Sequence, residues 1–200
     1  MSVGDGARMP PGRPVARFIG RIFAWLPLAF TVWYFAAPIL LWPVRLAVDV
    51  IAQLGFADIV RAVEQHGSDV TFVTSLRPGE ARAASGTVTV DVNLLVYSFG
   101  LPLYAALVLA VRERGWPQRL AWGFVVLIPF IAWGVLADFL KNVAITSGPL
   151  VASQTGFVAW QREVIAFAYQ FGALVLPTAV PAVAWVALHR GFLERLRVAR

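Results

Sequence analysis

The residues that could do chemistry in this sequence are few and widely spaced. Asp138 and Lys141 are three positions apart at the end of an apolar run. This spacing places both side chains on one face of a helix and predicts an ion pair. His66 has no second histidine on its side of the predicted membrane, so a metal-binding or pH-sensing role is not favoured. Nothing in the spacing of Asp49 and Asp91 requires these carboxylates to converge.

The sequence lacks the motifs of the common enzyme mechanisms. It contains no cysteine, which excludes disulfides, thiolate metal sites and cysteine nucleophiles. Paired carboxylates, a Ser/His/Asp set, HExxH, a phosphate-binding glycine loop and a cofactor fingerprint are also absent. We therefore expect a protein that is not an enzyme and that binds no metal or cofactor.

The hydrophobic content places the chain in a membrane. Of its 200 residues, 59% are hydrophobic, whereas soluble domains average about 45–50%. A helix that crosses a bilayer needs about 20 mostly apolar residues. Four runs satisfy this condition, at residues 22–44, 94–111, 120–138 and 164–189. They contain no charged residue except Asp138 at the end of the third, so a proton-coupled carrier would lack its usual relay.

The positions of the basic residues predict how the chain is oriented. The formal net charge is +6, but the arginines cluster beside the spans, which is typical of cytoplasmic segments and not of a nucleic-acid interface. The prediction is four spans with both termini in the cytoplasm. Residues 1–20 would be a flexible basic tail, residues 21–200 a single integral membrane domain, and membrane lipids the immediate partners. The predicted cytoplasmic arginines are Arg8, Arg13, Arg17, Arg21, Arg112, Arg114, Arg119, Arg190, Arg195, Arg197 and Arg200.

An extracytoplasmic α+β insert is predicted between the first and second spans, at residues 45–93. Val88, Val90 and Val92 alternate with polar residues, which indicates a half-buried strand. Residues 69–76 and 87–94 therefore predict a β-hairpin, with residues 77–85 as its loop. Residues 45–66 are expected to form one bent or two short amphipathic helices, and residues 139–163 a loop close to the membrane. An exposed edge of the hairpin could also accept an extended peptide, a minority alternative.

The junction between the hairpin and the second span supplies most of the candidate partner-binding residues. Gly100 and Pro102 interrupt the apolar run, which indicates either close helix packing or a notch that faces a partner. Asp138 and Lys141 are likewise either a surface ion pair that ends a helix or a functional pair. The candidate interface consists of Val88, Val90, Val92, Tyr97, Gly100, Pro102, Asp138 and Lys141.

Two segments suggest a family. Residues 26–43 read LPLAFTVWYFAAPILLWP, and residues 92–104 read VNLLVYSFGLPLY. Both segments, and the order of one span, an insert and three further spans, resemble the exosortase H-associated membrane proteins of Gram-negative bacteria. This resemblance implies a protein of the bacterial inner membrane. In such sorting systems an exosortase cleaves a C-terminal membrane anchor from exported proteins with a catalytic cysteine, which this chain lacks. The family offers no catalytic residues to transfer.

Two functions are therefore considered. In the first, the protein is a non-enzymatic accessory subunit that binds or positions an exosortase, another integral membrane protein or the anchored substrates. In the second, it is a small channel, carrier or lipid-binding protein that uses a kink at Pro177 and Pro181 in the fourth span. The sequence leaves the identity of the partner, the oligomeric state and the packing of the helices open.

Overall fold

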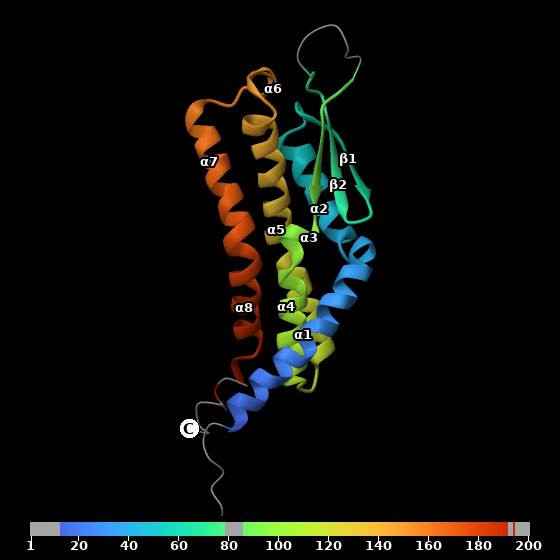
Figure 1. The fold of residues 1–200 in the computed structure, drawn as a ribbon, viewed down its shortest axis with the longest axis vertical. Helices are drawn as coiled ribbons and strands as arrows, with labels where there is room; N and C mark the ends of the chain where they lie inside the picture. Colours follow the sequence, from blue (N-terminus) through green and yellow to red (C-terminus); the bar gives the residue numbers. More distant parts are fainter. Residues whose placement is uncertain (1–12, 79–85, 192–193, 195–200) are drawn as a thin grey trace, which may run out of the picture.

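The protein is a bundle of long helices with a small antiparallel sheet packed against one end (Figure 1). The structure is a computed structural model and describes residues 13–78, 86–191 and 194. The first helix begins and the last long helix ends at the same end of the bundle, opposite the sheet (Figure 1). We call these two ends the terminal end and the sheet end. The predicted loop at residues 77–85 lies mostly outside the described residues.

Three helical stretches are long and apolar enough to cross a membrane: Ala16–Leu40, Trp116–Thr146 and Ala159–Leu188. The first lies in α1 (Arg13–Leu40), which begins inside the segment predicted as a tail. The second comprises α5 (Trp116–Lys141) and the π-helical η1 (Asn142–Thr146). The third comprises α7 (Ala159–Gln170), η2 (Phe171–Val175) and α8 (Leu176–Leu188). These stretches match three of the four predicted spans, with different ends.

The remaining predicted span is a shorter apolar stretch, Leu95–Val111. It consists of α3 (Leu95–Ser98) and α4 (Gly100–Val111). At about 1.5 Å per residue it is about 25 Å long, a little less than the hydrocarbon core of a bilayer. It ends at Arg112, whose φ of 43° is left-handed. A tight turn then leads into α5, so α4 and α5 are antiparallel neighbours as expected.

The sheet has three strands in the order β1-β2-β3, namely β1 (Val60–His66), β2 (Asp69–Thr74) and β3 (Thr89–Asn93). The predicted hairpin corresponds to β2 and β3. The helix predicted over residues 45–66 is wrong in its second half, because α2 spans Trp42–Gly55 and residues 60–66 form β1. A register shift between Val60 and Ala62 interrupts the alternation. This irregularity hid the period of two from the sequence.

One face of the sheet packs against the helices. Val70, Phe72 and Val92 are buried, and the Phe72 ring stacks on Phe139 of α5 with centroids 4.2 Å apart. A two-stranded hairpin is marginal in water. The third strand and the contact with α5 therefore stabilise the sheet as part of the bundle.

Much of the segment predicted as a loop at residues 139–163 is helical. α5 and η1 continue to Thr146, α6 spans Pro149–Gln154, and α7 begins at Ala159. Val143 and Val151 are buried, so this segment packs onto the bundle. The charge rule, which opposes a fifth span here, and the small and polar residues predict a loop, whereas the buried apolar side chains pack the segment as helix.

The turn between β1 and β2 depends on Gly67, whose φ is 64°. An L-residue in this left-handed region is disfavoured by roughly 1 kcal/mol. A Cβ atom there would meet no heavy atom within 4 Å, so backbone strain is the whole effect. We expect Gly67→Ala to lower the free energy of unfolding by about 1 kcal/mol, measured by thermal unfolding in detergent. Asparagine tolerates this region better than alanine, so Gly67→Asn should lower the free energy of unfolding by less. Equal losses for the two variants would contradict the explanation.

Candidate interaction surface

Five residues near the sheet end form a connected set, which we call the polar cluster: Tyr97, Asp138, Lys141, Asn142 and Tyr169. The Lys141 Nζ lies 2.7 Å from Asp138 Oδ1 and 4.0 Å from the centre of the Tyr169 ring. Asn142 Nδ2 donates to the same carboxylate oxygen at 3.1 Å. The Tyr97 side chain lies close to Asp138. The cluster therefore joins α3, α5, η1 and α7, and the predicted ion pair is present.

The contacts of the polar cluster indicate a structural role. Asp138 accepts from the side chains of Lys141 and Asn142, and Lys141 is held between a carboxylate and an aromatic face, where a cation is attracted. Only 17% of the Asp138 side chain and 23% of the Lys141 side chain are exposed. Among the residues that the structure describes, no group of three or more His, Cys, Asp or Glu is placed to hold a metal. The cluster fastens helices together at the sheet end.

Most of the candidate interface residues from the sequence lie inside the molecule. Val90, Val92 and Tyr97 are at most 7% exposed, while Val88 is partly buried against the same core. Pro102 is buried as well. These side chains hold the sheet and helices together and leave little surface for a partner.

Gly100 packs directly against α8 of the same chain. A Cβ atom at this position would lie 2.5 Å from the carbonyl oxygen of Pro177 and 2.6 Å from the ring of Pro181. Of the two interpretations of Gly100, the structure therefore favours close helix packing over a notch open to a partner. Gly134 of α5 makes a similar approach, since its Cβ would lie 2.4 Å from the Tyr97 ring.

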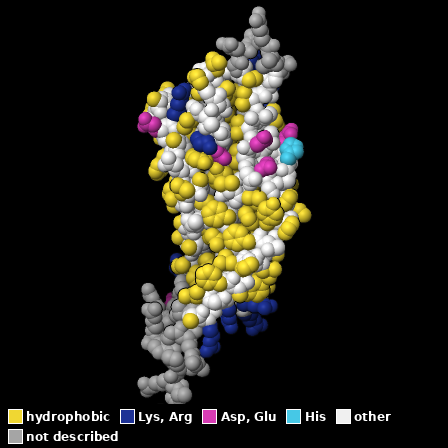
Figure 2. All heavy atoms as spheres, in the orientation of Figure 1, with side chains coloured by type: hydrophobic (Ala, Val, Ile, Leu, Met, Phe, Trp, Pro, Cys, Tyr) yellow, Lys and Arg dark blue, Asp and Glu magenta, His cyan; other side chains and the backbone are white. Residues whose placement is uncertain are grey.

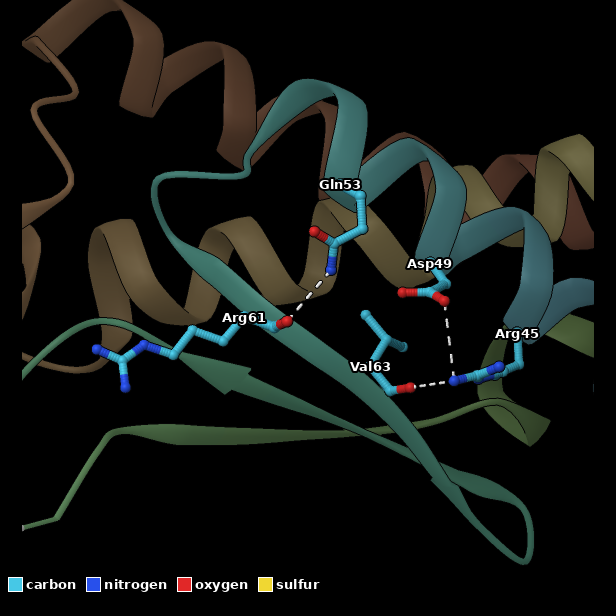
Figure 3. A network of polar contacts seen from close by, with 5 residues as sticks. All are labelled: Arg45, Asp49, Gln53, Arg61 and Val63. Atoms are coloured by element: carbon cyan, nitrogen blue, oxygen red, sulfur yellow. Dashed lines mark hydrogen bonds and ion pairs between the residues drawn. The ribbon is translucent and has the colours of Figure 1, made fainter.

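The outer edge of β1 is covered by polar side chains from α2 (Figure 3). Arg45 donates to the carbonyl oxygen of Val63 at 2.5 Å and lies 3.8 Å from Asp49. One turn further along α2 from Asp49, Gln53 donates to the carbonyl oxygen of Arg61 at 3.4 Å. These are main-chain acceptors that the edge strand would otherwise expose. The polar stripe of α2 thus blocks strand addition at β1.

We expect Arg45→Ala to lower the free energy of unfolding by about 1 kcal/mol, because the Val63 carbonyl loses a charged donor. Arg45→Lys should recover part of this loss, since an ammonium group can still donate. The measurement is thermal unfolding of both variants in detergent. A stability equal to that of the parent for Arg45→Ala would show that the contact does not matter.

The outer edge of β3 has no such cover among the described residues. The Leu94 N–H donates to the Ser68 carbonyl and the Thr74 N–H to the Val88 carbonyl. Hydrogen-bonded and non-hydrogen-bonded pairs alternate in an antiparallel ladder. The main-chain groups of Val90 and Val92 therefore also form hydrogen bonds with β2. The main-chain groups of Thr89, Asp91 and Asn93 therefore point away from β2. No described residue forms a hydrogen bond with these groups of Thr89 and Asp91.

The solvent-exposed face of the sheet is acidic. Asp91 is exposed and accepts a hydrogen bond from Thr71 at 2.6 Å. Glu64, on β1, lies 4.0 Å from His66, and both of these side chains are more than half exposed. Figure 2 shows acidic side chains and a histidine in the half of the molecule that holds the sheet. Lysine and arginine side chains gather at the terminal end, with a few more near the sheet end, and hydrophobic side chains cover the middle.

An apolar groove of about 660 Å³ lies between α1, α4 and the first half of α5. Its lining includes Leu28, Val32, Leu109, Trp116 and Phe124. The groove lies within the hydrophobic middle of the bundle and at its terminal end. The groove could not be predicted from the sequence, because most residues of the lining belong to apolar runs that also fit ordinary helix packing.

The fold is that of a helical membrane protein, with three candidate membrane-crossing helices and a small sheet at one end. The model of a family described as exosortase H-associated membrane protein matches residues 12–192. The chain belongs to this family, as the two sequence segments had suggested. No curated protein and no solved structure matches it.

Proposed function

We propose that the protein is a non-enzymatic accessory subunit of an exosortase-type sorting system, placed in the bacterial inner membrane. It would bind the exosortase or hold its C-terminally anchored substrates. The observation that carries this proposal is the family match over residues 12–192, because the family is defined by association with exosortase H. We propose four spans, with Leu95–Val111 as the second, and both termini in the cytoplasm.

The charge distribution supports this orientation. Arg17, Arg21, Arg112 and Arg114 are exposed at the terminal end, while Asp58, Glu64, Asp91 and Glu163 are exposed nearer the sheet end (Figure 2). Basic residues remain on the cytoplasmic side during insertion. The sheet would then lie on the periplasmic side, where an exported protein is cut from its anchor.

The packing supports a role in positioning. The sheet is fixed to the bundle by the Phe72–Phe139 stack, and β3 leads directly into α3, where Asn93 Oδ1 accepts from the Leu95 N–H at 2.8 Å. A protein surface held rigidly at the membrane interface can orient a partner without conformational cost. The polar cluster is internally paired, which suits a scaffold better than a reaction centre.

Lipid binding is a second candidate function, favoured by the apolar groove. Its volume of about 660 Å³ lies within the range of small-ligand pockets, and its position would place it among acyl chains. This function predicts lipid that stays bound to the purified protein and no stable protein partner. Native mass spectrometry in a lipid-retaining detergent would detect such a lipid.

Reconstitution tests the accessory function. Exosortase H, a substrate with its C-terminal anchor, and this protein would be placed together in liposomes, and cleavage of the substrate would be followed by gel electrophoresis. We expect faster cleavage when the protein is present and no cleavage when the exosortase is left out. Equal rates with this protein and with an unrelated four-span protein would contradict the proposal. Cleavage without the exosortase would show that the protein is itself an enzyme.

A further inference from the structure

The two edges of the sheet differ in whether their outward main-chain groups have hydrogen-bond partners. At β1, the carbonyl oxygens of Arg61 and Val63 accept from Gln53 and Arg45 of α2. At β3, the outward main-chain groups have no such partners within the described part of the chain. Proteins usually protect exposed edges because these edges invite pairing with another chain. Among the described residues, α2 protects the edge at β1 and nothing protects the edge at β3. The main-chain groups of β3 are therefore free to pair with another strand.

The geometry of β3 suits the addition of one more strand. The residues Thr89, Asp91 and Asn93 form non-hydrogen-bonded pairs with β2, so their N–H and C=O groups lie on the outer side. β3 spans five residues, about 17 Å at the rise of a strand. Extended peptides bind to such edges through main-chain hydrogen bonds, while their side chains give specificity.

The side chains beside this edge define the chemistry of the occupant. Asp91 is exposed on the outer face of the sheet, and Asp69 of the neighbouring strand pairs with Asn93 across the ladder. On the opposite face, Val90 and Val92 are buried. In a fourth strand, every second side chain would lie beside Asp91 on the exposed face, and the others would lie beside Val90 and Val92 on the buried face. Opposite charges on neighbouring strands attract, so basic and apolar residues in alternation fit best.

We propose that the open edge of β3 binds an extended segment, with alternating basic and apolar residues, of an exported protein, and that the segment adds to the sheet as a fourth antiparallel strand. This inference rests on the proposed function and names what the accessory subunit holds. β3 is followed at once by α3, so the bound segment lies where the chain enters the predicted membrane. A substrate with a membrane anchor would present such a segment at this height.

The test uses purified full-length protein in phosphatidylcholine nanodiscs and a fluorescent eight-residue peptide of alternating lysine and valine. A peptide of alternating glutamate and valine is the charge control. Two further peptides carry N-methyl groups, one on the lysines and one on the valines. In an antiparallel fourth strand the lysine N–H groups face β3, so only N-methyl-lysine removes the pairing donors. Empty nanodiscs measure binding to lipid.

We expect the lysine peptide to bind, and the N-methyl-lysine peptide to bind at least about tenfold more weakly, because several main-chain hydrogen bonds are lost. The N-methyl-valine peptide should bind as the parent does. Equal binding of both methylated peptides would overturn the proposal, as would a preference for the glutamate peptide.

Variants of the protein provide a second arm. Thr89→Pro removes an outward N–H and keeps the ladder to β2, because proline is accepted in an edge strand where its N–H faces solvent. This variant should bind the lysine peptide about tenfold more weakly than the parent does, with little change in its thermal stability. Asp91→Lys should reverse the charge preference, whereas the matched change Glu64→Lys on β1 should not. Unchanged binding by both β3 variants would overturn the proposal.

Two further outcomes separate the possibilities. A dimer that dissociates on Thr89→Pro in the absence of peptide would mean that a second copy occupies the edge, which overturns the peptide proposal. Co-purification of an exosortase with a protein that does not bind the peptide would reject the edge site and leave the accessory function standing. Peptide binding by a protein that enriches neither an exosortase nor its anchored substrates would reject the accessory function and leave the edge site standing.

Discussion

Gly100→Leu is expected to separate α4 from α8 and to lower the stability of the bundle by about 3 kcal/mol or more. The reason is the rigidity of what surrounds Gly100. A Cβ atom would lie 2.5 Å from the main-chain oxygen of Pro177 and 2.6 Å from the Pro181 ring. Neither a carbonyl oxygen nor a proline ring can rotate away, so the two helices themselves must move apart.

Gly100→Ala tests the same contact with the smallest possible change. It should cost about 1–3 kcal/mol, whereas Gly20→Ala in α1, where nothing lies within 4 Å of the added atom, should be neutral or stabilising. Thermal unfolding in detergent compares the three variants. If Gly100→Ala unfolds at the same temperature as Gly20→Ala, the close packing described here is incorrect.

Asp138→Ala is expected to have the second largest effect, a loss of about 2 kcal/mol. The carboxylate is shared by Lys141 and Asn142, so its removal leaves both donors without this acceptor. Lys141 would remain as a cation with only 23% of its side chain exposed. The partial exposure of the pair keeps the cost below that of a fully buried ion pair.

A double-mutant cycle isolates the contribution of the ion pair. Lys141→Met keeps the length of the side chain and should lower the free energy of unfolding less than Asp138→Ala, because Asn142 keeps its acceptor. The double variant should be less destabilised than the sum of the two single losses. Unfolding in detergent gives all three values. Exactly additive losses would mean that the two charges do not interact in the folded protein.

Several features could be predicted because they depend on local sequence. The spacing of Asp138 and Lys141 fixes their distance on a helix, and the pair is present at 2.7 Å. The alternation over residues 87–94 correctly gave a strand, β3. Three of the apolar runs correspond to helices long enough to cross a membrane. In each case a short-range periodicity or a run length determines the structure.

The features that could not be predicted depend on contacts between distant segments. The helix predicted over the residues of β1 is wrong because the register shift after Val60 disturbs the alternation, and only pairing with β2 decides the conformation of this segment. The neighbour of Gly100 is α8, and no pattern within residues 94–111 identifies it. The difference between the two edges of the sheet could not be predicted either, because it depends on the position of α2 over β1.

Taken together, these contacts place a small acidic sheet firmly on a helical membrane bundle. The Phe72–Phe139 stack and the polar cluster fix the sheet end, while Gly100 allows α4 and α8 to pack closely. Such rigidity suits a protein that presents a surface to a partner. Most candidate interface residues found in the sequence are buried, and they pack the sheet and the helices together.

The central proposal, an accessory role beside an exosortase, is tested most directly by isolation of the protein from its own membrane. The protein would be tagged at its C-terminus, extracted in mild detergent and purified, and the accompanying proteins would be identified by mass spectrometry. A four-span protein without a sorting role, tagged in the same way, is the control. We predict enrichment of an exosortase or of its anchored substrates over this control. A preparation that contains only the protein and lipid would contradict the accessory role and favour lipid binding.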